Sequence, residues 1–143
     1  MARIRSIHPG LFTDEAFMSA SPFARLMIIG IWGEAWDDGI FEWKPLTLKA
    51  KLFPVDSVDT VSLLEELERL QFIKRFSFDG KQYGAVRNFC KWQRPKKPNS
   101  SGVLTPELRT YVSLSSDNSE PVRNQFGKVS ADGGCRREDG GDR

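Results

Sequence analysis

Aromatic and cationic side chains alternate in the stretch NFCKWQRPKKPNSS, which covers positions 88–101. Flat aromatic rings stack on other flat rings, and amino and guanidinium groups bind phosphates and carboxylates. Pro95 and Pro98 favour an extended chain without internal hydrogen bonds. The segment is therefore either a solvated linker, whose charges keep it in water, or an arm that lies along a polyanion.

Positive charge is concentrated around this stretch. The chain of 143 residues has a formal net charge of +2, yet eight cations and a single anion, Asp79, lie between positions 74 and 97. Such clustering favours an anionic partner, for example nucleic acid, over an even scatter of charge, although a solvated face is the plainer interpretation. The eight cations are Lys74, Arg75, Lys81, Arg87, Lys91, Arg94, Lys96 and Lys97.

Few residues have the chemistry of catalysis or metal binding. The chain contains two cysteines, Cys90 and Cys135, and one histidine, His8, and no CxxC or HExxH pattern joins them. We therefore expect no zinc or haem site and no cofactor. Because no nucleophile–base set and no phosphate-binding loop is visible, we expect no enzyme activity.

Composition and the first residues predict the compartment and the size of the core. Two lone cysteines make no disulfide framework, which favours a reducing cytosol. The opening MARIRSIHPG has no apolar signal core, so we expect a cytoplasmic protein without membrane contact. Hydrophobic residues make up 39% of the chain and include four Trp, which is enough for one packed domain.

Two segments have strong helix signals. Ser21 is a suitable N-cap and Pro22 suits the first helical position, so a largely apolar helix begins there and ends at the DDG of positions 37–39. A second helix with one apolar stripe begins after Asp56 or Ser57. Between them the pattern predicts a short strand at 40–43 and a short helix at 45–53.

The Asp-Gly dipeptide at 79–80 separates two alternating runs and predicts a β-hairpin. In that register Phe78 faces Lys81, and Phe76 faces Tyr83 as an aromatic pair across the strands.

This order of elements predicts a mainly α fold with a small β-hairpin, namely a winged helix-turn-helix domain. We expect the domain, with an N-terminal arm and a basic C-terminal arm, to cover residues 1–98. Residues 99–143 are rich in Ser, Gly and Asp and poor in apolar residues, so we expect a disordered polar tail there.

Several segments together resemble a known family. They are ARIRSIHPGLFTDE, SPFARLMIIGIWGEAWDDG, KLFP, LLEELERLQFIKRF, GKQYGAVRNF and KWQRPKKP, which cover roughly residues 2–98. The sequence resembles the N-terminal winged-helix domain of phage and prophage replication proteins, the replisome-organiser and DnaD-like group. The resemblance implies DNA binding in replication initiation or its control, in the cytoplasm of a bacterial host. Larger relatives carry a second region that contacts a replicative helicase or its loader. Here only a short polar tail follows the domain, so binding to a helicase or its loader is left open. Whether the chain forms a homo-oligomer is also left open.

In such a domain the second helix of the motif enters the major groove. Here that helix carries Glu65, Glu66 and Glu68, whose carboxylates repel phosphates, so we expect contacts mainly to the DNA backbone. The candidate DNA-binding residues are Arg3, Arg5, Lys49, Lys51, Ser57, Thr60, Lys74, Arg75, Lys81, Arg87, Lys91, Arg94, Lys96 and Lys97.

Alternatives remain for several of these residues. Ser57 and Thr60 are donors to DNA or, instead, helix caps. Trp92 stacks on an unpaired base or packs into the core, and the core is the favoured position for it as for Phe89. As a whole, the chain is a DNA-binding protein or, alternatively, a protein–protein adaptor or transcriptional regulator with the same fold.

Overall fold

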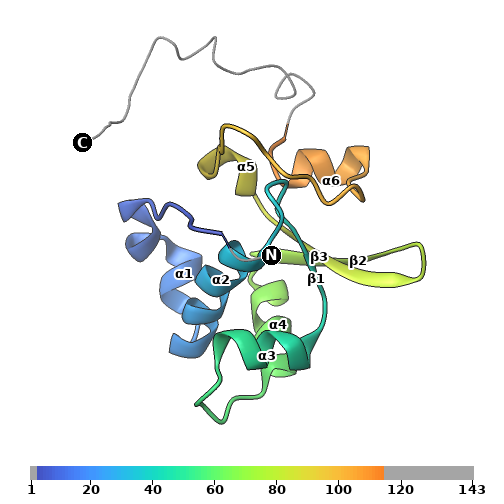
Figure 1. The fold of residues 1–143 in the computed structure, drawn as a ribbon. Helices are drawn as coiled ribbons and strands as arrows, with labels where there is room; N and C mark the ends of the chain where they lie inside the picture. The colour runs from blue at the N-terminus through green and yellow to red at the C-terminus, as the bar shows by residue number, and fades with distance from the viewer. Residues whose placement is uncertain (1–2, 115–143) are drawn as a thin grey trace. The chain divides into compact units, whose positions relative to one another are not determined.

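The computed structural model describes residues 3–114, which form a mixed α/β unit of six α-helices and a three-stranded antiparallel sheet (Figure 1). In the described part of the chain no helix is both long and apolar enough to cross a membrane. The elements in chain order are the 3-10 helix η1 (Pro9–Thr13), α1 (Glu15–Ser19), α2 (Pro22–Glu34), β1 (Ile40–Glu42), α3 (Pro45–Leu52), α4 (Thr60–Arg69), β2 (Ile73–Phe78), β3 (Lys81–Val86), α5 (Phe89–Trp92) and α6 (Pro106–Tyr111).

Helix α2 begins where the sequence predicts it. The Ser21 hydroxyl accepts a hydrogen bond from the Ala24 amide at 3.4 Å, and Pro22 occupies the first turn. Glu66 of α4 accepts hydrogen bonds from the Ser21 amide at 2.7 Å and from its hydroxyl at 2.8 Å. The two helices are therefore joined at this cap, and α2 buries Met27 and its apolar neighbours between the other elements.

Helix α4 begins later than expected. Its cap is Asp59, not Asp56 or Ser57, because the Asp59 carboxylate accepts hydrogen bonds from the amides of Val61 and Ser62 and from the Ser62 hydroxyl. The hydrogen bond from that hydroxyl is the main cause that lowers the pKa of Asp59. One carboxylate thus satisfies two backbone N–H groups at the first turn.

The predicted hairpin is confirmed, and a third strand joins it in the order β1-β3-β2. Asp79 and Gly80 have φ angles of 53° and 79°, which suit a two-residue hairpin turn. Phe76 lies opposite Tyr83, and their ring centroids are 5.7 Å apart.

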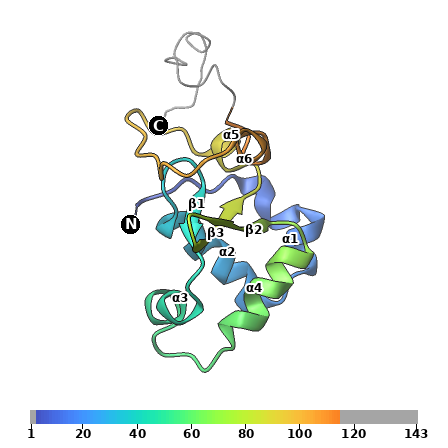
Figure 2. The same cartoon turned by 90° about the vertical axis from the view of Figure 1, so that its right-hand side faces the viewer.

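The sheet has two faces because successive side chains on a strand alternate. The inner face, towards α2 and α4, carries Phe41, Ile73, Arg75, Ser77, Gln82, Gly84 and Val86. The outer face, where α6 lies on the side of the sheet away from α4 (Figures 1 and 2), carries Ile40, Glu42, Lys74, Phe76, Phe78, Lys81, Tyr83 and Ala85.

The segment after residue 98 differs from the expected tail. Helix α6 is capped by the Thr105 hydroxyl, and Val103, Leu108 and Val112 are buried. The amides of Asn88 and Cys90 donate to the carbonyls of Tyr111 and Val112 at 2.9 and 2.8 Å. The few apolar residues here are spaced so that each reaches the domain, and folding therefore continues through residues 99–114. The expected disorder of 115–143 lies outside the described residues.

Candidate nucleic-acid interface

The turn after α2 contains a buried carboxylate that fixes the N-terminal arm. The Asp37 side chain is fully buried and forms ion pairs with Arg3 at 2.9 Å and with Arg5 at 2.8 Å. Arg5 also donates to the backbone carbonyls of Trp32 and Ala35. Only 6% of the Arg5 side chain is exposed, and its guanidinium holds the arm to the domain. Arg3 shares the same partner and retains 34% exposure.

The neighbouring carboxylate, Asp38, fixes the segment that leaves the domain. It accepts hydrogen bonds from the Ser100 hydroxyl and from the amide and hydroxyl of Ser101, all between 2.8 and 2.9 Å. The Asn99 amide donates to Asp37 at 2.7 Å. The sequence predicted that the helix ends at the DDG of 37–39, and the structure has a turn there, after α2 ends at Glu34. The partners of the two carboxylates were not foreseen, because they come from segments distant in the chain.

Residues 91–97, here called the basic loop, are consequently anchored on both sides. Before the loop, Phe89 and Cys90 are buried, which confirms Phe89 as a core residue. Within it, the buried Gln93 amide donates to the Ser6 carbonyl at 2.7 Å and accepts from the Ser6 amide at 3.0 Å. Beyond it lies the Asp38 anchor. The expected extended arm is thus a tethered loop, and its exposed cations are Lys91, Arg94, Lys96 and Lys97.

The hairpin cations divide between the two faces of the sheet. Lys74, whose Nζ lies 5.7 Å from the Tyr111 ring centroid, and Lys81 are on the outer face. Arg75 is on the inner face, where its guanidinium lies 5.1 Å from the Trp43 ring and its Nε donates to Gln82 at 3.2 Å.

The remaining candidates lie on the opposite side of the sheet from α5 and α6 (Figures 1 and 2). Lys51 of α3 pairs with Glu34 at 3.2 Å, and Lys49 lies 3.5 Å from the Phe53 carbonyl. Thr60 is buried and its hydroxyl donates to the Pro45 carbonyl at 3.1 Å, whereas Ser57 is exposed. The structure therefore places α3 and α4 on the side of the sheet opposite α5 and α6.

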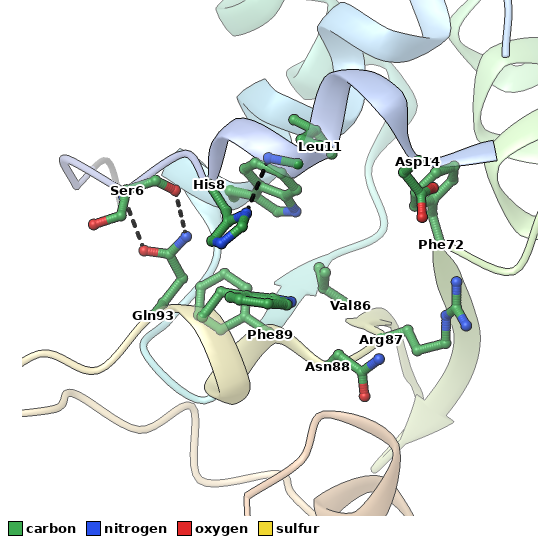
Figure 3. A pocket seen from close by; sticks show the side chains of 13 residues that line it. Ser6, His8, Leu11, Asp14, Phe72, Val86, Arg87, Asn88, Phe89 and Gln93 are labelled. Atoms are coloured by element: carbon green, nitrogen blue, oxygen red, sulfur yellow. Dashed lines mark hydrogen bonds between the residues drawn. The ribbon is translucent and has the colours of Figure 1, made fainter. Parts of the chain in front are cut away.

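A pocket of about 400 Å³ lies between the N-terminal arm and the corner that joins β3 to α5 (Figure 3). Trp92 lines it, with half of its surface exposed and its ring 4.8 Å from that of His8. Trp92 is therefore a surface residue, contrary to expectation, because Phe89 and Cys90 occupy the core side of this one-turn helix. Arg87 reaches the same pocket from the end of β3.

Burial dominates the electrostatics of the single described thiol. It raises the pKa of Cys90 to about 12, with the nearby Asp38 adding to the effect. A thiol held in its neutral form is a poor nucleophile and metal ligand, so Cys90 is a packing residue.

No model of a known protein family matches this chain, and neither a curated protein nor a solved structure matches it.

Proposed function

We propose that this chain is a DNA-binding protein with a winged helix-turn-helix domain, in which the β2–β3 hairpin is the wing. The order α2, β1, α3, α4, β2, β3 and the strand order β1-β3-β2 support this fold. With the sequence resemblance stated above, they support a role in phage or prophage replication initiation or its control.

The observation that carries the proposal is the run of exposed cations along the chain from the hairpin to the basic loop. Lys81, Arg87, Lys91, Lys96 and Lys97 are all exposed and all lie within 17 positions of one another in the chain. Lysine side chains at such positions neutralise phosphates and release counterions, which gives affinity without a choice of sequence.

Helix α4 is poorly suited to major-groove reading. Its cap Asp59 and its residues Glu65 and Glu68 are exposed carboxylates, and its only basic residue, Arg69, stands at the far end. These acids repel phosphates on the side of the sheet opposite α6. We therefore place the DNA backbone along the hairpin and the basic loop.

The test is the salt dependence of binding to a short duplex, measured by fluorescence anisotropy. Changing Lys96 and Lys97 to Ala is expected to weaken binding to every duplex sequence and to lower the magnitude of the salt slope by about 2, since each lost phosphate contact removes about 1. The matched control changes Lys49 and Lys51 to Ala, which removes the same charge from α3. Equal effects of the two double variants would contradict the proposed surface.

A protein–protein adaptor is the second candidate, and the exposed apolar side chains of the helical side favour it. Leu46 and Val55 are 83% and 90% exposed, and Phe23, Leu26 and Val61 are between 43% and 52% exposed. An adaptor is expected to show little DNA affinity at any moderate salt concentration, so the same titration separates the two functions.

A further inference from the structure

We propose that the outer face of the hairpin binds single-stranded DNA by stacking unpaired bases on its aromatic side chains. The inference rests on the proposed DNA binding and adds the form of DNA that the site accepts. The aromatic strip, defined as Phe76, Phe78 and Tyr83, lies on the outer face between Lys74 and Lys81.

The strand register places these side chains on one surface. Phe76 pairs with Tyr83 and Phe78 pairs with Lys81, and paired residues of an antiparallel sheet point to the same face. The Phe76 and Tyr83 rings stack at an interplanar angle of 25°. From α6 towards the turn, Lys74 is therefore followed by the stacked pair and then by Phe78 and Lys81 side by side.

At the tip of the hairpin, the polar side chains lie on the face towards the helices and the aromatic side chains lie on the opposite face, the reverse of the arrangement that would extend the core. On the inner face, towards the helices, the tip carries the polar Ser77 and Gln82. On the outer face Phe78 is 40% exposed, and Phe76 and Tyr83 are partly exposed. Since a solvated hairpin face is normally polar, aromatic rings here are better explained by a ligand than by folding.

Single-stranded DNA fits the chemistry of this surface better than a duplex does. Only unpaired bases offer flat faces for stacking, and lysines beside the rings attract the connecting phosphates. An acid lies at the margin of the strip, because Glu42 of β1 pairs with Tyr83 in the sheet; its carboxylate forms an ion pair with Lys44 at 3.4 Å. The strip is therefore bordered by Lys74 and Lys81 on the hairpin and by the Glu42–Lys44 ion pair on the β1 side.

The experiment compares binding of an oligothymidylate of about 12 nucleotides with binding of a duplex of the same length. Changing Phe78 to Ala is expected to weaken oligothymidylate binding about tenfold, the effect of losing one base stack, and to leave duplex binding nearly unchanged. Phe78→Tyr keeps a flat ring and is expected to bind like the parent chain.

The matched control is Ser77→Ala, next to Phe78 on the opposite face, which is expected to change neither affinity. Thermal unfolding of each variant checks that it is folded. The inference is overturned if Phe78→Ala binds oligothymidylate as tightly as the parent chain does. It is also overturned if Phe78→Ala loses as much affinity for duplex as for oligothymidylate. If the parent binds duplex but not oligothymidylate, the strip fails while the proposed function stands; if it binds neither, both fail.

Discussion

Replacing Asp37 by Asn is expected to destabilise the domain by about 3–5 kcal/mol. The substitution keeps the shape of the side chain and removes its charge, so Arg5, with 6% of its side chain exposed, loses its ionic partner. Removing one member of a buried ion pair has this cost because the remaining charge stays desolvated. Asn keeps one acceptor oxygen where the carboxylate has two, so either Arg5 or Arg3 together with the Asn99 amide faces an NH2 group that cannot accept its hydrogen bond.

Urea unfolding at neutral pH, followed by circular dichroism, measures this loss. The control is Glu42→Gln, which breaks an ion pair with Lys44 whose side chains are 45% and 60% exposed. An exposed pair of that kind contributes at most about 1 kcal/mol. If Asp37→Asn costs no more than the control, the arm is not held by this carboxylate.

A double-mutant cycle separates coupling from general damage. Arg5→Ala alone is also expected to be strongly destabilising, and Asp37→Asn added to it is expected to cost less than in the parent chain, because the two side chains act on each other. Fully additive effects would refute the pairing. Should Asp37→Asn be too unstable to analyse, Arg3→Ala supplies a milder change, since a third of the Arg3 side chain is exposed.

Two further predictions concern the corner after β3. Phe89→Ala is expected to cost about 3–5 kcal/mol, whereas Trp92→Ala is expected to cost less than about 1.5 kcal/mol because half of its surface is already in water; equal costs in urea unfolding would place both side chains in the core. The second prediction concerns Cys90 in a chain whose other thiol, Cys135, is replaced by Ser. Burial raises the Cys90 pKa from 9.0 to about 12 in the folded state. Above pH 9 the unfolded state therefore loses a proton that the folded state retains. Stability is therefore expected to fall from pH 9 towards 12, and a Cys90→Ala variant that falls as steeply would contradict this origin.

Local signals predicted most of the central elements correctly. The Ser-Pro start of α2, the Asp-Gly turn and the Phe76–Tyr83 pair follow from backbone rules that depend on a few neighbouring residues. The cap of α4 was misplaced by two or more residues because Asp56, Ser57 and Asp59 are all good caps in sequence. Their choice depends on how Thr60 packs against α3, which no local pattern contains.

Contacts between distant segments were not predictable in the same way. Residues 99–114 were predicted to be a tail because their composition contains few apolar residues. The fold needs only three of them, Val103, Leu108 and Val112, at the spacing that lets each be buried. Likewise, nothing in the sequence near Arg3 and Arg5 indicates that they form ion pairs. Their ion pairs are with Asp37, more than 30 positions away.

The division of charge between the two sides of the sheet has a consequence for how DNA would approach. Exposed carboxylates at Glu65 and Glu68 repel phosphates from the α4 side, whereas Lys81 and Lys97 attract them to the other side. The buried ion pair between Arg5 and Asp37 is consistent with this division, because it removes the Arg5 charge from the surface of the N-terminal arm. If the chain binds DNA as proposed, an encounter steered in this way would bring the polyanion to the outer face first, where the aromatic strip lies. Affinity from the cations and selection of unpaired bases by the rings would then act on the same side of the sheet, without any contact from α4.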